Sequence, residues 1–437
     1  ISYEIVETGN HILVQVKKET EKDAKKLIKQ RRGIDVDFGT FEDKDTYKML
    51  SQGKTMGVFQ MESPGFRKMM MKMEPDSIDD IIVMISLYRP GPMDQIPRYI
   101  KNKNNKENIE YTHKSLESIL KPTYGCMVYQ EQVMQIFREL AGYTLGRADI
   151  VRRAMGKKKI DVMNKEREVF VEGASKNGID EASANKIFDE MAEFAKYAFN
   201  KSHAAAYAVV AYETAYLKCH YPAEYFAALM TSMMDSMSKI SQYTAEAKKN
   251  GVQVLPPSVN YSDSGFTPDG KNIRFGLLAV KNLGLGIIDR LVKEREQNGK
   301  YTSMYDFCLR NYSREFNRKA LEGLIKSGAM DGLEDNRRQM LYNIEGVLSA
   351  VENERRFSGQ GQLDLFDEMG SPNTFVMQPV PEMSQEMRLL LEKEATGLYL
   401  SGHPLDKYEA FLKNAKLDSL TSVIEGKYTD GKRITVA

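Results

Sequence analysis

The feature that most constrains this fold is a long helical region that proline and glycine residues divide into short segments. From residue 46 to about residue 248, most segments have the apolar spacing of a helix. The strongest interruption is residues 89–92 (Arg-Pro-Gly-Pro). This segment cannot lie inside a helix, because proline lacks a backbone N–H and clashes with the preceding turn. The pattern predicts a mainly α fold made of many helices.

Length and composition bound the class of protein. At roughly 150 residues per domain, the 437 residues suggest about three domains. The chain is 42% hydrophobic and 28% charged, which is typical of globular domains and excludes a collagen, a disordered chain and a small disulfide scaffold. No apolar run approaches the ~18 residues of a membrane span, so we expect no membrane partner. The three cysteines show no pairing or metal spacing, which favours a reducing cytosol.

The two ends of the sequence suggest a longer parent chain. Residue 1 is isoleucine, and residues 433–437 form a strand-like run with nothing after it. We therefore expect a fragment of a longer protein. Near the start, residues 1–16 alternate weakly in polarity, which is consistent with a short hairpin, and residues 17–32 form a charged helix.

Charge is balanced over the whole chain, with 62 basic and 61 acidic residues, so binding to nucleic acid must depend on local patches. One such patch is residues 147–167, with eight basic and three acidic residues. Arginine makes bidentate phosphate contacts and lysine acts as a mobile charge. We therefore predict that Arg152, Arg153 and Lys157 bind phosphate. The alternative is a solvated helix face.

A second phosphate site is predicted at the start of a helix over residues 201–220. Asn200 or Ser202 can cap this helix, which leaves free backbone N–H groups at its positive end. The predicted nucleotide-binding residues there are Lys201, His203 and Tyr207, the last as a stacking surface for a base. A merely capped helix with an exposed lysine is an equal alternative. Four small residues on one face favour close helix packing: Ala204, Ala208, Ala211 and Ala215.

A third site is the Gly-x-Gly turn at residues 281–286, which we predict to lie between two apolar helices. The backbone amides of such a hairpin can hold one DNA phosphate without reading bases. Lys281, Gly284 and Gly286 are the predicted DNA-binding residues. Before this turn, residues 266–275 around Pro-Asp-Gly predict a small strand hairpin.

Residues 358–385 have the composition of a linker, rich in Gly, Pro, Ser and Gln. An exposed Leu-x-Leu-Phe inside it costs solubility unless a partner pocket takes it. The predicted partner-binding residues are Gln362, Leu363, Asp364, Leu365 and Phe366. The alternative is that this segment folds back on its own domain.

Asp35 and Asp37 resemble an acid pair of the kind that two-metal phosphoryl transfer needs. No partner acid stands out nearby, so we prefer an acidic loop before a helix. The five histidines show no metal-ligand spacing. We therefore assign no catalytic residue and no metal ligand.

Taken together, motifs along the chain closely resemble the α subunit of bacterial replicative DNA polymerase III. No single motif carries the match, which follows family order over residues 33–437. The matching stretches are residues 58–63, 88–92, 122–125, 129–134, 141–145, 152–159, 199–207, 220–224 and 397–404. The resemblance implies DNA-directed 5′–3′ synthesis, in which a primer 3′-hydroxyl attacks the α-phosphate of a dNTP and pyrophosphate leaves.

The resemblance implies a mainly α, multidomain fold, in which a helical fingers domain precedes a helix-hairpin-helix domain with minor β structure. Five parts are expected. They are residues 1–32, unmatched or a remnant of the palm; 33–250, the fingers; 251–355, a tandem helix-hairpin-helix domain; 356–420, a linker and helix with a clamp-binding motif; and 421–437, the truncated start of an OB-fold.

The resemblance also implies residue roles. Arg152 and Arg153 would contact the incoming triphosphate, and Tyr207 would line the nucleotide pocket, with Lys201 and His203 nearby. The family binds Mg²⁺ through palm aspartates that we do not find here, so we expect this chain alone to be inactive. The expected partners are primer–template DNA, dNTP, the β sliding clamp and other replicase subunits, in the bacterial cytoplasm. The alternative is a non-catalytic, DNA-binding adaptor tethered to the clamp.

Overall fold

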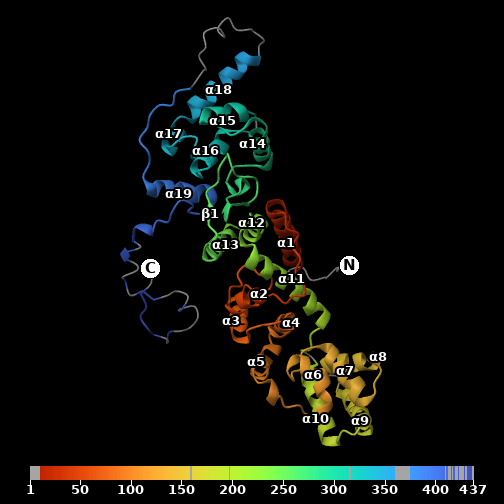
Figure 1. Ribbon diagram of the computed structural model, residues 1–437. Helices are drawn as coiled ribbons and strands as arrows, with labels where there is room; N and C mark the ends of the chain where they lie inside the picture. Colours follow the sequence, from red (N-terminus) through yellow and green to blue (C-terminus); the bar gives the residue numbers. More distant parts are fainter. Residues whose placement is uncertain are drawn as a thin grey trace. The chain divides into compact units, whose positions relative to one another are not determined.

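The computed structural model describes residues 10–157, 160–195, 197–313, 316–359 and 375–408, with short stretches between 410 and 435. Contacts divide the chain into two compact units, residues 1–229 and 230–437. Both are mainly helical in their described parts, and the second contains a small sheet (Figure 1). The predicted mainly α, multidomain fold is confirmed, whereas the five domain boundaries stay predictions. None of the described helices is both long and apolar enough to cross a membrane.

The first core of unit 1 forms where α11 (Lys201–His220) packs against α4 (Ile78–Leu87). Small side chains let two helix backbones approach closely. The predicted stripe is fully buried here: Ala204, Ala208, Ala211 and Ala215. The packing interpretation of these alanines is therefore confirmed. The helices that complete this core are α2 (Lys44–Ser51), α3 (Pro64–Met73) and α5 (Ile96–Asn104).

The N-terminal helix α1 (Asn10–Arg32) packs against α11. The hairpin expected over residues 1–16 is wrong for its described part, because residues 10–16 belong to this helix. An isolated hairpin is marginally stable, whereas a helix that already contains good helix formers extends at little cost. The last two residues of α1, both arginines, bind the buried carboxylate of Glu224 in α12 (Pro222–Thr231) at 2.8 to 3.0 Å.

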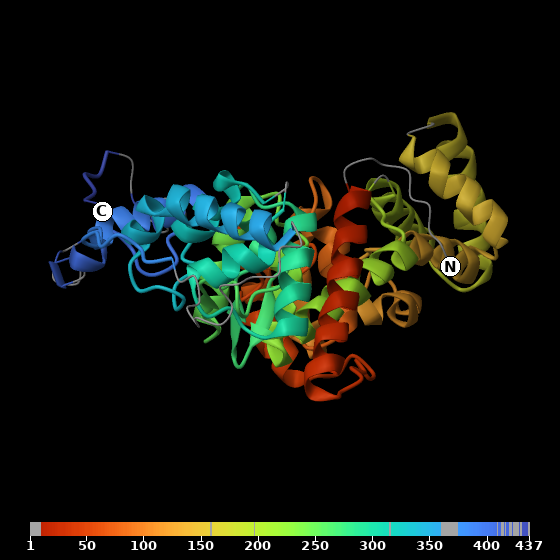
Figure 2. The ribbon, with the colours of Figure 1, turned by 90° about the horizontal axis from the view of Figure 1, so that it is seen from above.

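The second core of unit 1 is built around three phenylalanines. The ring of Phe137 lies 5.4 Å from that of Phe170 and 6.2 Å from that of Phe188. All three rings are fully buried. The helices that supply this core lie together in both ribbon views (Figures 1 and 2): α6 (Glu117–Leu120), α7 (Gln130–Ala141), α8 (Leu145–Gly156), α9 (Ile160–Lys176) and α10 (Glu181–Phe194).

The predicted break at residues 89–92 separates α4 from the 3-10 helix η1 (Pro92–Gln95). Gly91 has a φ of 101°, and a Cβ atom there would lie 2.4 Å from the ring of Tyr197. Only glycine fits such a position. Other single-turn helices in unit 1 are η2 (Lys106–Asn108), η3 (Lys114–Leu116) and η4 (Lys121–Thr123).

Unit 2 contains a three-stranded sheet of order β1-β3-β2. β2 (Thr267–Asp269) and β3 (Asn272–Arg274) form an antiparallel hairpin, and β1 (Val254–Leu255) pairs in parallel with β3. Gly270, with a φ of 58°, makes the turn. The predicted strand hairpin at residues 266–275 is therefore confirmed.

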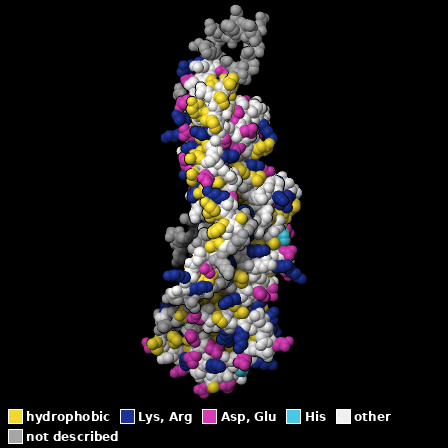
Figure 3. Space-filling view, turned by 90° about the vertical axis from the view of Figure 1, so that its left-hand side faces the viewer, with side chains coloured by type: hydrophobic (Ala, Val, Ile, Leu, Met, Phe, Trp, Pro, Cys, Tyr) yellow, Lys and Arg dark blue, Asp and Glu magenta, His cyan; other side chains and the backbone are white. Residues whose placement is uncertain are grey.

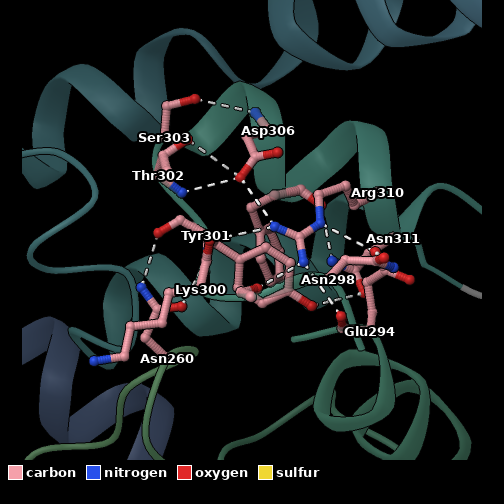
Figure 4. A network of polar contacts seen from close by, with 12 residues as sticks. Asn260, Glu294, Asn298, Lys300, Tyr301, Thr302, Ser303, Asp306, Arg310 and Asn311 are labelled. Atoms are coloured by element: carbon pink, nitrogen blue, oxygen red, sulfur yellow. Dashed lines mark hydrogen bonds and ion pairs between the residues drawn. The ribbon is translucent and has the colours of Figure 1, made fainter. Parts of the chain in front are cut away.

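Helices form the rest of unit 2, and a polar network fixes one of their junctions (Figure 4). Arg310 donates to the side chain of Glu294 at 3.1 Å and to the carbonyl of Gly299 at 2.8 Å, and its guanidinium lies 4.4 Å from the ring centre of Tyr301. The network ties α14 to α15. The described helices of this unit are α13 (Met237–Lys249), η5 (Leu277–Ala279), α14 (Leu285–Asn298), α15 (Met304–Asn311), α16 (Arg318–Lys326), α17 (Arg337–Tyr342), α18 (Ile344–Gly359), α19 (Gln385–Thr396) and η7 (Asp406–Tyr408).

Candidate nucleotide and nucleic-acid sites

The predicted arginine pair lies on α8, which begins at the N-cap Thr144. Arg152 donates to Asp149 at 2.8 Å, and Arg153 donates to the other oxygen of the same carboxylate at 2.8 Å. These guanidinium groups hold the pKa of Asp149 below its usual value. Arg153 is 68% exposed and Arg152 only 13%, so Arg153 is the more accessible phosphate ligand. Lys157 follows on the exposed surface, directly after α8.

Other basic residues of the patch at 147–167 have partners of their own. Arg147 binds Glu166 at 3.0 Å and stacks over Tyr143, with 4.6 Å between the guanidinium carbon and the ring centre. Arg167 binds Asp189. The space-filling view shows positive and negative side chains interspersed over the face it draws (Figure 3). Phosphate binding on α8 would therefore depend mainly on Arg152, Arg153 and Lys157.

The start of α11 is capped as predicted, but it is not open. The Asn200 side chain accepts a hydrogen bond from the His203 amide at 2.9 Å, which confirms the cap. The Lys201 amide, expected to be free, instead donates to both oxygens of Glu131 at 3.1 and 3.2 Å. The Lys201 ammonium lies 3.8 Å from Asp79. Carboxylates thus already supply the negative charge that a helix N-terminus favours.

Residues 129–132 (Tyr-Gln-Glu-Gln) hold this helix start, a role that the sequence analysis did not assign to this matching stretch. The Gln130 amide donates to the Phe199 carbonyl at 2.9 Å, and its side chain donates to the Ala198 carbonyl at 3.0 Å. Gln132 caps its own helix by accepting from the amides at residues 128 and 129. The signal of this segment in the sequence is three consecutive polar side chains in the first turn of α7. The sequence does not indicate their distant partners.

His203 and Tyr207 form an aromatic stack that continues into the first core. Their ring centres are 4.6 Å apart, and the ring of Tyr207 lies 5.4 Å from that of Phe59. Tyr207 is 8% exposed, and burial raises the pKa of its hydroxyl. The ring therefore serves mainly as core. Its role as a stacking surface for a base stays a prediction.

The Gly-x-Gly turn in unit 2 is exposed, but one expectation about its flanks is wrong. Directly before the turn the structure has no α-helix, only the single turn of η5 (Leu277–Ala279). β3 ends at Arg274, which leaves too few residues before Lys281 for a longer helix. Asn282 makes the turn with a φ of 67°.

The N-terminus of α14, which follows the turn, is open. Its N-cap is Gly284, which provides no capping side chain. A Cβ atom at Gly284 would meet no heavy atom within 4 Å, and Leu285 is 52% exposed. The first amides of α14 therefore lie where a phosphate could reach them.

Asp35 and Asp37 lie in the exposed loop before α2, as preferred from the sequence. Asp35 pairs with Lys29, and Asp37 accepts a hydrogen bond from the Gly39 amide at 3.0 Å. Within the described part of the chain, no three carboxylate, thiol or imidazole groups gather as metal ligands. This part of the chain therefore does not fit the Mg²⁺ ions that the family resemblance implies.

Some predicted residues lie outside the described part. These are the linker motif of Gln362, Leu363, Asp364, Leu365 and Phe366, and two further lysines of the α8 patch, at residues 158 and 159. Of residues 421–437, the structure describes only a few. Among these, the Thr435 carbonyl accepts from the Asp418 amide at 2.7 Å. The OB-fold assignment stays a prediction.

The fold and these sites define a helical protein with a finger-type domain and a helix-hairpin-helix domain. Residues 19–178 match the family described as bacterial DNA polymerase III alpha subunit finger domain, and residues 251–340 match the helix-hairpin-helix motif. The first match begins inside α1, within the segment that we left unmatched from the sequence.

Individual relatives agree with these matches. The DNA polymerase III subunit alpha of Chlamydia pneumoniae is 42% identical over 93% of this chain and 33% of its own length. The subunit of Chlamydia trachomatis is 45% identical over 93% of this chain and 32% of its own length. The subunit of Thermus aquaticus is 42% identical over 88% of this chain and 32% of its own length. Over most of its length the chain is similar to bacterial DNA polymerase III α subunits, and it spans about a third of the length of these relatives.

Proposed function

We propose that this chain is the part of a replicative DNA polymerase that binds the incoming dNTP, the primer–template duplex and the sliding clamp during 5′–3′ synthesis. The observation that carries the proposal is the arginine pair on α8, which lies inside the finger-domain match and is held by one carboxylate. Two guanidinium groups fixed by Asp149 are preorganised for a polyphosphate, since their geometry needs little reorganisation when the ligand arrives.

The proposed contribution to chemistry is positioning and charge compensation. Arg153 and Lys157 would neutralise the triphosphate, and Arg152 would act from its mostly buried position. A bound triphosphate holds the α-phosphorus in place for attack by the primer 3′-hydroxyl, with pyrophosphate as leaving group. In the duplex, the amides at the start of α14 would hold one phosphate without reading the sequence.

We further propose that Gln362 to Phe366 bind the β sliding clamp, that other replicase subunits are partners, and that the protein works in the bacterial cytoplasm. These proposals are supported by the similarity to DNA polymerase III α subunits and by the sequence motif. We also propose that the chain alone binds DNA but does not extend a primer. Extension with Mg²⁺ and dNTPs that is lost in the Asp35→Ala/Asp37→Ala double variant would overturn this last proposal.

The test of the central proposal compares two exposed arginines in unit 1. Arg153→Ala should weaken dNTP binding about tenfold, since a charge-assisted contact contributes roughly 1.5 kcal/mol or more. The matched control is Arg138→Ala on α7, whose arginine is 45% exposed and paired with Glu139. It should leave affinity unchanged. Equal dNTP affinity of both variants, measured by fluorescence titration, would contradict the assignment.

A further inference from the structure

α19 lies beyond the residues matched to the helix-hairpin-helix motif, yet it belongs to the same unit and contacts α16. Its residue Glu392 is fully buried and binds the buried Arg337 at 2.9 Å. Two residues further along α19, Glu394 binds Lys326 of α16 at 2.9 Å. A buried ion pair with both partners hydrogen-bonded fixes a helix in one position, because any displacement leaves a charge unpaired.

The carboxyl end of α19 reaches the exposed turn itself. The Ala395 carbonyl accepts a hydrogen bond from the Lys281 amide at 2.8 Å. This amide is the first of the turn that we propose to hold a DNA phosphate, so it is already occupied within the protein. The phosphate contacts are thereby left to the amides that follow Gly284.

The carbonyl of Lys281 packs closely against α16. A Cβ atom at Gly323 would lie 2.6 Å from the Lys281 oxygen, closer than real Cβ contacts allow. Glycine inside a helix is less favourable than alanine, so its presence here calls for a packing reason. The close approach of the Lys281 carbonyl is that reason.

The Lys281 amide is therefore bonded to α19, and the Lys281 carbonyl packs against Gly323 of α16. A cavity of about 130 Å³ lies where these elements meet, lined by Lys281, Gly323, Lys326 and Glu394 among others. The cavity leaves room for the turn to move if its supports are changed. The direction of the open amides of α14 thus depends on contacts far outside the Gly-x-Gly sequence.

We propose that α19 is part of the DNA-binding site, and that Gly323, Lys326 and Glu394 are positioning residues for the turn at residues 281–286. This inference rests on the proposed function, because it assumes that the turn holds a phosphate of duplex DNA. These residues act through Lys281 rather than by touching DNA.

The first test is Gly323→Ala in the full chain. Hydrogen exchange at the Lys281 amide should accelerate at least tenfold, and affinity for a primer–template duplex should fall about fivefold or more across a salt series. The melting temperature should fall only modestly, because the helix preference of alanine offsets part of the cost of the clash. The control is Gly146→Ala on α8, where a Cβ meets no heavy atom within 4 Å and no effect on duplex binding is expected.

The second test separates positioning from direct contact. Lys326→Glu and Glu394→Lys should each weaken duplex binding, and the double exchange, which restores the ion pair with reversed polarity, should recover most of the affinity. If Lys326 contacts a phosphate directly, the double variant will bind as weakly as Lys326→Glu, which would overturn its positioning role.

The two proposals can fail separately. If the unaltered chain does not bind duplex at low salt, the proposed function of the turn is wrong, and the exchange measurement still decides whether Gly323 and α19 fix the turn. Unchanged exchange at Lys281 in the Gly323→Ala variant would overturn the inference whatever the DNA result.

Discussion

Two helix N-termini of this molecule, those of α11 and α14, were predicted from sequence to bind phosphate, and the structure gives them opposite characters. At α11 the Asn200 side chain caps one amide and the Glu131 carboxylate takes another. At α14 the cap is Gly284, with open space around it. One terminus carries its own anion and the other does not.

The difference teaches that a helix dipole is not by itself a ligand site. The amides at a helix start attract whatever acceptor the fold brings to them, and a carboxylate seventy positions earlier in the chain satisfies this need at α11. A glycine cap without a side chain leaves that need to an external ligand. On this comparison, α14 is the stronger candidate for a backbone-held phosphate, and a nucleotide near α11 would use the side chains of Lys201 and His203.

The largest expected effect comes from making the open terminus resemble the filled one. Gly284→Asp introduces a good N-cap residue, which should stabilise α14 by up to about 1 kcal/mol. Because the new carboxylate competes with phosphate, we expect duplex affinity to fall about tenfold or more. Gly284→Ala, which leaves the amides free, is the control. In the aspartate variant, duplex affinity measured by anisotropy should fall while the melting temperature rises. An aspartate variant with unchanged duplex affinity would contradict the assignment of a phosphate site to the start of α14.

A smaller effect is expected when the filled terminus is opened. Glu131→Ala frees the Lys201 amide and removes a negative charge beside it, so we expect dNTP affinity to rise about threefold to tenfold. The lost charge-assisted bonds should cost roughly 1 to 3 kcal/mol of unfolding free energy. Glu131→Gln keeps a hydrogen-bond acceptor without the charge. Its dNTP affinity and its free energy of unfolding should therefore lie between those of the unaltered protein and of Glu131→Ala. Weaker dNTP binding in the alanine variant would show that Glu131 positions Lys201 rather than competing with phosphate.

The features that the sequence predicted correctly are those that short-range chemistry decides. The break before η1 follows from proline geometry, the cap of α11 from the side chain of Asn200, and the β2–β3 hairpin from a Pro-Asp-Gly turn. The buried alanine face follows from helical spacing in the same way. The expected helix before the Gly-x-Gly turn was wrong because the short segment between β3 and Lys281 has room for only a single turn.

The features that could not be predicted are long-range pairings of backbone groups with distant side chains or carbonyls. Glu131 meets Lys201, and Ala395 meets Lys281, across separations that carry no periodic signal. These pairings decide which backbone amides are already bonded within the protein and which can still bind a ligand. Sequence motifs were therefore enough to identify the candidate site residues. Which of these residues a ligand can reach became clear only from the structure.

The smallest expected effect is on stability, and it concerns residues inside α11 and α14 instead of at their N-termini. On α14, Glu294 faces Arg310, whereas on α11 Glu213 faces another carboxylate, Glu21 of α1, with which it shares a hydrogen bond. Burial, followed by this like charge, raises the pKa of Glu213 from 4.5 to about 7, although Lys25 and Lys18 act in the opposite direction.

The sign of the resulting pH dependence follows from linkage. Because the folded pKa of Glu213 is raised, its contribution to stability is fully present below pH 4.5 and is lost as the pH rises through about 7. Glu213→Gln keeps a neutral side chain at every pH, so it should match the unaltered protein at pH 5 and exceed it by about 1 kcal/mol at pH 8, a value discounted for partial exposure. The control Glu294→Gln breaks an opposite-charge pair and should be destabilising or neutral at both values. Urea unfolding at the two pH values measures the free energy of unfolding of both variants. If Glu213→Gln is no more stable than the unaltered protein at pH 8, α1 and α11 tolerate two ionised carboxylates.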